Sequence, residues 1–320
     1  MRRQIFTFGQ YLHQKFGVKV SKVPVSISGF TCPNIDGTVA KGGCTFCEND
    51  SFSPSLDRAR ELKGFFLNLQ STSNPNLDKQ LQQLEWQFQS LSKRLREENK
   101  AEKFLVYFQS FTNTYAPLET LKALYEKALT FEDVVGLSIG TRSDSITDEA
   151  FEYLGELSKK TEIWVEFGIQ SIYDETLMRI NRGHDSANVK EAIRKAKRYG
   201  LNVCGHLIFG LPGETKEMMI ETAKAAYDLG IDSVKYHPLY VVKRTALANE
   251  YARGEFTPIT QEEYLAVLKE ALLLKPSHVS VQRITAGIDD NTLIAPEWCR
   301  DKNEQVRAVN RALEEIGLKY

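Results

Sequence analysis

Three cysteines within one short segment, Cys32, Cys44 and Cys47, are the residues of this sequence best suited to chemistry. Their arrangement, Cys-x11-Cys-x2-Cys, allows three thiolates to converge on one metal centre. A structural zinc site needs a fourth protein ligand, and none of the five histidines lies inside this segment. A four-iron cluster can be held by three cysteines, which leaves one iron open to bind a small molecule. The spacing favours such a cluster over a zinc site completed by a distant histidine, or over a set of ordinary buried thiols.

The other two cysteines predict different roles. An odd count of five cysteines argues against a disulfide framework and favours metal binding, catalysis or burial. Cys204 lies in a predicted strand, so we expect it in the core. Cys299 lies beside Trp298 near the end of the chain, where burial and a role on the substrate side are both open.

The elements that must position these residues follow an alternating pattern. Up to about residue 240, short β-rich segments alternate with longer helical patterns, which is typical of βαβ units around a parallel sheet. An open partial barrel and a doubly wound sheet both fit this alternation. The predicted strands are residues 23–28, 104–110, 134–141, 162–170, 201–209 and 232–238, and the predicted helices are residues 76–99, 118–129, 148–159, 187–199 and 215–229.

Composition limits the function classes. The chain has 320 residues, with 41 Lys and Arg against 42 Asp and Glu, so it is neither polybasic overall nor an acidic disordered chain. Its apolar runs are much shorter than the roughly 20 residues that cross a bilayer, and its first residues lack the features of a secretory signal. We therefore expect no membrane span and a cytoplasmic location.

The three-cysteine loop directly follows the first predicted strand, and an aromatic residue, Phe46, precedes its last cysteine. This loop resembles that of the radical S-adenosylmethionine (radical SAM) superfamily. The long first gap and the segment 107–117, Tyr-Phe-Gln-Ser-Phe-Thr-Asn-Thr-Tyr-Ala-Pro, are similar to the YhcC/YtqA-like radical SAM proteins. These are relatives of the Elongator catalytic subunit and of oxygen-independent coproporphyrinogen oxidase.

The resemblance implies a fold and cofactors. It implies an α/β fold of the radical SAM type, a partial (βα)6 TIM-like barrel with a C-terminal helical extension. We expect a basic N-terminal segment at residues 1–22, the barrel at 23–240 and an extension at 241–320 that closes the substrate side, with helices at 244–253, 261–275 and 302–316 and a strand at 278–282. The implied cofactors are a [4Fe–4S] cluster on Cys32, Cys44 and Cys47 and S-adenosylmethionine, which contacts Thr112, Glu166, Gln170, Arg182, His206 and Gly210.

The implied activity is reductive cleavage of S-adenosylmethionine to a 5'-deoxyadenosyl radical that takes hydrogen from a substrate. A reductant such as flavodoxin or ferredoxin would supply the electron. The protein itself would supply ligation, orientation and shielding from water. Candidate residues on the substrate side are His237, Lys243, Arg283 and Cys299.

Two segments suggest the substrate. Residues 1–22 are basic, contain no acid and carry Phe6, Phe8, Tyr11 and Phe16, and residues 179–198 are also basic. Cations interleaved with rings suit single-stranded RNA, although a solvated basic helix fits equally well. Because relatives act on wobble uridines of tRNA, we predict a radical step on a modified wobble uridine, without the acetyltransferase domain of the Elongator subunit. The alternatives are a radical SAM enzyme for a small molecule such as a tetrapyrrole, and a non-enzymatic zinc-binding module.

Overall fold

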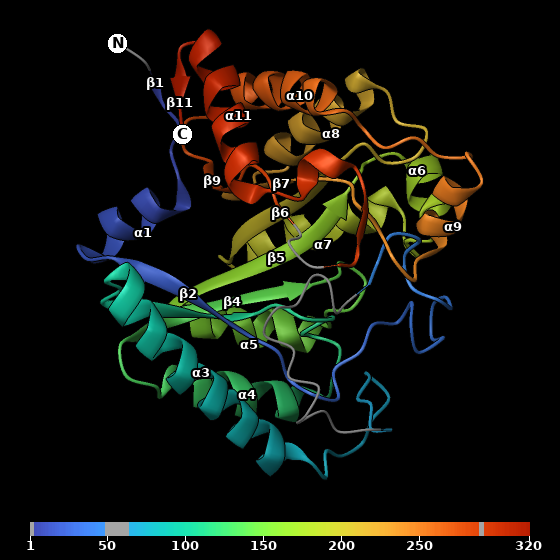
Figure 1. The fold of residues 1–320 in the computed structure, drawn as a ribbon. Coiled ribbons are helices and arrows are strands. Elements are labelled where there is room, and N and C mark those ends of the chain that lie inside the picture. Colours follow the sequence, from blue (N-terminus) through green and yellow to red (C-terminus); the bar gives the residue numbers. More distant parts are fainter. Residues whose placement is uncertain (1–2, 49–63, 288–290) are drawn as a thin grey trace.

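The structure is a computed structural model and describes residues 3–48, 64–287 and 291–320. Its centre is a curved sheet of parallel strands in the order β2-β3-β4-β5-β6-β7-β9 (Figure 1). The strands are β2 (Val20–Val25), β3 (Lys103–Phe108), β4 (Val134–Thr141), β5 (Glu162–Gln170), β6 (Asn202–Phe209), β7 (Ser233–Pro238) and β9 (Ser280–Arg283). The predicted partial barrel is confirmed. The short strand expected in the extension joins the barrel as a seventh strand beside β7, because its register with Ser233 and Val234 continues the ladder.

Helices cover the convex side of the sheet, as the crossover rule for parallel strands requires. They are α3 (Leu77–Asn99), α4 (Leu118–Leu129), α5 (Asp148–Ser158), α7 (Ser186–Arg198), α8 (Lys216–Asp228) and α10 (Gln261–Leu274). The short helix α6 (Asp174–Arg179) instead packs near the cysteine loop, where Leu177 lies in one cluster with Cys44. The chain also forms α9 (Ala246–Ala252), α11 (Lys302–Glu315), the 3-10 helix η2 (Glu297–Cys299) and the short strands β1 (Arg3–Gln4), β8 (Val241–Val242), β10 (Leu293–Ala295) and β11 (Leu318–Lys319). In the described residues, no helix combines the length and the apolar character needed to cross a membrane.

The two faces of each strand differ sharply in polarity. Because side chains alternate along a strand, Val165 and Phe167 of β5 enter the large apolar core beneath the helices. Their neighbours Trp164 and Glu166 therefore point into the barrel. The interior of the barrel has two layers. The layer near the amino ends of the strands is apolar and contains Trp164 and Leu105. The next layer toward the carboxyl ends, called the charged layer below, contains Lys22, Glu166 and Lys235.

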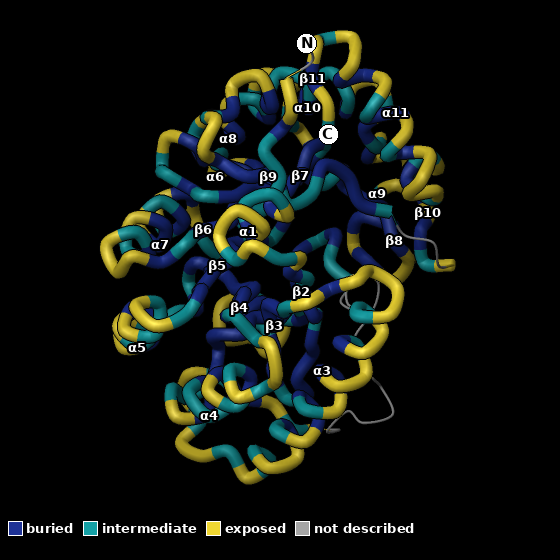
Figure 2. Tube along the Cα trace, turned by 90° about the vertical axis from the view of Figure 1, so that its left-hand side faces the viewer, coloured by how far each residue is buried: buried dark blue, intermediate teal, exposed yellow. Residues whose placement is uncertain are grey.

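Helix α1 (Phe8–Phe16) closes the barrel at the amino ends of the strands. Phe8 and Leu12 are buried against Trp164, and the rings of Phe8 and Trp164 meet edge to face with centroids 4.9 Å apart. Figure 2 shows α1 in the middle of the curved row of strands. A capping box of Thr7 and Gln10 fixes where the helix begins.

This packing removes Phe8 and Lys22 from the RNA contact predicted for residues 1–22, while the rings of Phe6, Tyr11 and Phe16 stay partly exposed. Phe8 is 7% exposed, Lys22 lies inside the barrel, and Lys15 donates to Glu162 at 2.5 Å. Rings buried in a core cannot stack on bases. Both the RNA-binding pattern and a buried plug use aromatic residues between cations, so the local sequence did not distinguish them.

The basic segment 179–198 is also largely neutralised by the chain itself. Ion pairs join Arg179 to Glu250, Lys195 to Asp148, Lys197 to Asp232 and Arg198 to Glu191. Most of these cations therefore lie beside an acid of the same chain, and the segment is a weaker electrostatic footprint than its composition suggested.

Tyr11 gives a test of the plug. Its hydroxyl donates to Glu162 Oε1 at 2.7 Å, and the Glu162 side chain is 2% exposed. We expect Tyr11→Phe to lower the free energy of unfolding by about 1.5–3 kcal/mol, since the lost bond reaches a buried charge. Urea unfolding measures this loss. The matched control is Tyr173→Phe, whose partner Glu221 lies at the surface, and which should change little. Equal effects of the two changes would contradict this role of Tyr11.

Candidate cofactor and substrate site

The three cysteines of the loop after β2 lie close together at the carboxyl ends of the strands. Cys44 and Cys47 are joined by a tight turn in which Cys47 N donates to Cys44 O at 2.9 Å. Burial, and then the neighbouring thiols of Cys44 and Cys32, raise the pKa of Cys47. The three thiols are therefore near enough to influence one another, although their ligand atoms do not all lie within 4.8 Å of one another as those of Glu166, Cys204 and His206 do.

Residues on the α6–α7 connection hold this loop in position. Asn34 Nδ2 donates to the backbone oxygens of Asn181 at 2.6 Å and Arg182 at 2.9 Å. Asn181 returns a bond to Gly43 O at 2.7 Å. Gly183 has φ +80°, and a Cβ there would collide with Asn34 Oδ1. Sequence reasoning missed Asn34 and Asn181, because their partners are about 140 residues away.

Arg182 connects the cysteine loop to the end of β5. Its Nη1 donates to Cys44 Sγ at 3.7 Å, and its Nη2 donates to Gly168 O at 2.7 Å. The β5–β6 ladder shifts register between Gly168 and Gln170, and Gln170 takes φ 65°. A non-glycine residue in the left-handed region is strained, and such strain is typical of functional sites. The structure thus brings the predicted residues Arg182 and Gln170 beside the cysteines.

The turn after β3 holds Thr112, one of the residues predicted to contact S-adenosylmethionine. Phe111 has φ 63°, and Thr112 N donates to Thr31 O at 3.2 Å, which ties this turn to the cysteine loop. Asn113 braces the turn through bonds to the oxygens of Phe108 at 3.1 Å and Gly140 at 2.9 Å.

Buried polar atoms without a hydrogen-bond partner gather around these turns. In the described part of the chain they include acceptors and donors within reach of the loop ends: Asn34 Oδ1, Asn113 Oδ1, Gln170 Oε1, Ser110 Oγ, Arg142 Nη1 and Arg182 Nε. Buried polar groups are almost always paired in a complete site. A zwitterionic amino acid with a ribose offers both the donors and the acceptors that these atoms lack, so the residues fit S-adenosylmethionine.

Inside the barrel, Glu166 forms a buried ionic group with residues from several strands. Its Oε1 accepts from Ser138 Oγ at 2.5 Å and from Lys22, and its Oε2 lies 2.7 Å from His206 Nε2 and accepts from Lys235. Despite burial, the two lysines hold the pKa of Glu166 well below its usual range. Both oxygens are therefore engaged, which favours a role in holding the lysines over the predicted contact with the cofactor.

His206 belongs to the same group and is 20% exposed. Burial and the charge of Lys235 lower its pKa to about 4, so the ring is neutral at physiological pH. Glu166, Cys204 and His206 lie close enough to resemble metal ligands. The ammonium groups of Lys22 and Lys235 already neutralise the carboxylate, so this trio is a poor metal site. Cys204 is buried in the core, as predicted.

The candidates for the substrate side are distributed unevenly. His237 and Arg283 lie half-buried at the carboxyl side of the charged layer, on the neighbouring strands β7 and β9. Lys243 is exposed, after β8. Cys299 is fully buried among Tyr240, Val242 and Leu293, and burial raises the pKa of its thiol. Its surroundings favour burial over a substrate role.

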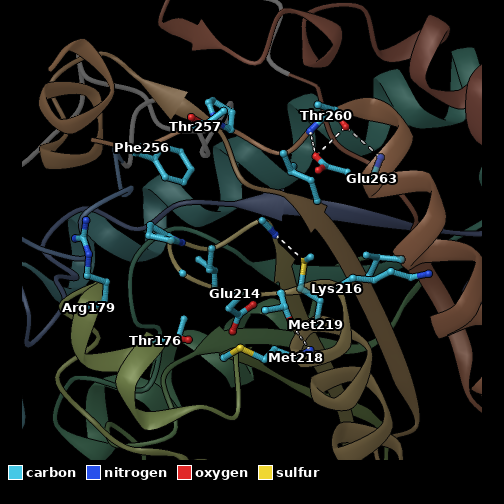
Figure 3. A pocket seen from close by; sticks show the side chains of 18 of the residues that line it. Thr176, Arg179, Glu214, Lys216, Met218, Met219, Phe256, Thr257, Thr260 and Glu263 are labelled. Atoms are coloured by element: carbon cyan, nitrogen blue, oxygen red, sulfur yellow. Dashed lines mark hydrogen bonds between the residues drawn. The ribbon is translucent and has the colours of Figure 1, made fainter. Parts of the chain in front are cut away.

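Gly210 lines a cavity of about 920 Å³ between the β6–α8 turn and residues 255–260 (Figure 3). It has φ +93°, and a Cβ there would lie 2.7 Å from Ile259. Glu214 faces this cavity, accepts from Ser171 Oγ, and has a pKa raised to about 7 by burial. The cavity therefore lies at the end of β6, where Gly210 was predicted to contact S-adenosylmethionine.

A partial barrel of parallel strands that carries a three-cysteine loop at their carboxyl ends defines a class of iron–sulfur enzymes that act at an open iron. Family comparison agrees with this class: residues 37–226 match the radical SAM superfamily and residues 231–315 match the radical SAM C-terminal domain. The chain belongs to the radical SAM superfamily. It is therefore a radical SAM enzyme, and its cofactors are a [4Fe–4S] cluster and S-adenosylmethionine.

Relatives define the closer family. YtqA of Bacillus subtilis (strain 168) is 38% identical over 98% of this chain and 91% of its own length. YhcC of Escherichia coli (strain K12) is 33% identical over 99% of this chain and 95% of its own length. The resemblance to YhcC/YtqA-like proteins is confirmed.

More distant relatives share part of the chain. A tRNA uridine(34) acetyltransferase of Methanocaldococcus infernus is 33% identical over 50% of this chain and 30% of its own length. The solved structure of the archaeal Methanocaldococcus infernus Elp3 has a TM-score of 0.59, with 20% identity over 93% of this chain and 64% of that one. At this identity the structural likeness shows the fold alone.

Gly168 gives a test of the cofactor contacts. A Cβ at Gly168 would lie 2.7 Å from Gln170 Nε2 and 2.9 Å from Arg182 Nη2. Displacing a charge-assisted hydrogen bond costs about 1.5–3 kcal/mol, so we expect Gly168→Ala to weaken binding of S-adenosylmethionine about tenfold or more. Anaerobic calorimetry of the reconstituted protein measures this. Gly9→Ala, where the nearest atom is Thr7 Oγ1 at 3.9 Å, is the control, and affinities as strong as in Gly9→Ala would contradict the assignment.

Proposed function

We propose that this enzyme acts on a uridine at the wobble position of tRNA, on a base that already carries a modification. When bound, the reduced cluster and S-adenosylmethionine supply a 5'-deoxyadenosyl radical that takes hydrogen from the substrate. The single observation that carries the substrate class is the 33% identity over 163 residues with a tRNA uridine(34) acetyltransferase. That stretch covers half of this chain.

Different residues of the chain hold the cluster, orient S-adenosylmethionine and exclude water. Cys32, Cys44 and Cys47 hold the cluster, and Arg182 and Gln170 orient S-adenosylmethionine beside it. Helix α1, which closes the barrel at the amino ends of the strands, keeps water out of the barrel, and this protects a reactive species. An external one-electron donor such as flavodoxin or ferredoxin completes the proposal.

The test is anaerobic reconstitution followed by measurement of 5'-deoxyadenosine with and without bulk tRNA. We expect tRNA to stimulate its formation, and RNase digestion of the tRNA to remove the stimulation. Binding of tRNA should weaken steeply as salt rises, because phosphate contacts release counterions. An unstimulated rate with tRNA, together with stimulation by a small molecule such as a tetrapyrrole, would overturn the substrate assignment and leave the radical SAM assignment intact.

A further inference from the structure

The charged layer of the barrel contains more cations than anions. Lys22 and Lys235 donate to Glu166, the one carboxylate that bonds to this group among the described residues, and Arg283 of β9 lies in register with Lys235 of β7. Arg283 forms no hydrogen bond or ion pair with any described residue. Its charge nevertheless reaches inward, since after burial Arg283 is the main cause of the lowered pKa of His237. The layer therefore keeps a net positive charge.

The unused polar groups of this layer are hydrogen-bond donors. Lys235 donates to Tyr107 OH at 3.1 Å and to Glu166, which leaves one of the three ammonium protons of a lysine unassigned. Gln282 accepts from Lys22 at 2.6 Å through Oε1, while its Nε2 is buried and unpaired among the described residues. The ammonium of Lys235, the amide Nε2 of Gln282 and the guanidinium of Arg283 are all donors. A ligand whose groups are hydrogen-bond acceptors would satisfy them.

Part of this layer is exposed to solvent, although Lys235 itself is only 4% exposed. Lys22 and His206 remain 18% and 20% exposed, although both lie inside the barrel. Arg283, His237 and Gln282 are half-buried. These partly exposed polar groups lie between helix α1 and the carboxyl ends of the strands. Such an arrangement is typical of the floor of a binding site rather than of a closed core, and we call this set of residues the floor.

We propose that this floor binds an anionic group of the substrate, a carboxylate or a phosphate, between Arg283, Lys235 and Gln282. Arginine suits this task, because its planar fork matches two oxygens of either group. Glu166 then sets the positions of Lys22 and Lys235 and limits the local charge, so it is a positioning residue. This inference deepens the proposed function and rests on it only for the identity of the substrate.

The experiment follows the ring signals of His206 and His237 by NMR, in the full-length, cluster-reconstituted chain with isotope-labelled histidine at neutral pH. Inorganic phosphate and acetate are titrated separately at constant ionic strength set by chloride. We expect saturable shifts of both signals, and Arg283→Gln should weaken the anion affinity about tenfold or more. Arg283→Lys keeps the charge without the fork and should lie between the two. Arg198→Gln, which alters an exposed pair with Glu191, should behave like the unmodified chain.

The two titrants distinguish the source of the anion. Shifts with acetate alone identify a carboxylate site, and shifts with phosphate identify a site for a phosphate group. Unsaturable shifts, or equal shifts in Arg283→Gln and Arg198→Gln, would overturn the proposal. Formation of 5'-deoxyadenosine without substrate, measured in the same samples, tests the radical SAM activity independently. A failure of the anion-binding proposal can therefore be distinguished from a failure of the radical SAM activity.

Discussion

Replacing Cys44 with serine is expected to abolish cluster assembly. A serine hydroxyl stays protonated at neutral pH and is a poor ligand for iron in place of a thiolate. Cys44 is also the buried member of the trio, the one that receives the hydrogen bonds from Arg182 and Asn34 at 3.7 Å each. We expect iron to fall from about four atoms per chain to near zero after anaerobic reconstitution. Iron and acid-labile sulfide analysis, with visible absorption, measures the loss.

Cys299→Ala is the matched control for this experiment, because it removes a buried thiol from an apolar cluster elsewhere in the chain. It should keep its iron and sulfide. Retention of iron by Cys44→Ser, or binding of about one zinc without sulfide in the unmodified chain, would contradict the three-cysteine cluster.

Glu166→Gln is expected to give the largest loss of stability among these changes. It leaves the buried ammonium groups of Lys22 and Lys235 without a counter-charge, and breaking a buried ion pair typically costs about 3–5 kcal/mol. Urea unfolding measures the difference in the free energy of unfolding. Glu270→Gln breaks an ion pair with Lys216 that is nearly half exposed on both sides, so it should cost less than about 1 kcal/mol.

The effect of Glu166→Gln should depend on pH in a definite direction. The two lysines hold the pKa of Glu166 in the folded state well below its ordinary value of 4.5. A carboxyl with a depressed folded pKa contributes its stability fully above the unfolded value, and loses it as pH falls through the folded value. The difference between the two proteins should therefore stay constant from neutral pH down to about pH 5 and shrink below pH 4.5. A difference that grows on acidification would contradict the ionic role of Glu166.

Local sequence patterns were sufficient for most strands of the sheet, and the resemblance to radical SAM proteins decided between a barrel and a doubly wound sheet. Strands β4 and β5 occupy the predicted residues 134–141 and 162–170, because period-two runs bounded by turn residues have few alternative structures. The spacing of Cys32, Cys44 and Cys47 predicts them as cluster ligands. Strand β9 was placed outside the barrel, since a four-residue strand carries no sign of which neighbour it pairs with.

The contacts within the charged layer could not be predicted from local sequence patterns. Lys22 and Glu166 are 144 residues apart, and nothing near Lys22 shows that its neighbours Val23 and Val25 face the helices and turn it inward. Glu166 and His206 were predicted as cofactor contacts because the segments that contain them resemble cofactor-binding segments of radical SAM proteins. Only the three-dimensional register shows that they bond to each other.

The edge strands of the curved sheet, β2 and β9, are linked by contacts near the amino ends of the strands. There Phe6 O accepts from Val281 N at 2.9 Å, and Lys22 of β2 reaches Gln282 of β9 at 2.6 Å. No ladder joins β2 to β9 in the described chain. Separating β2 from β9 at the carboxyl ends of the strands would therefore break no interstrand backbone hydrogen bonds, so the sheet can widen there without loss of its ladders.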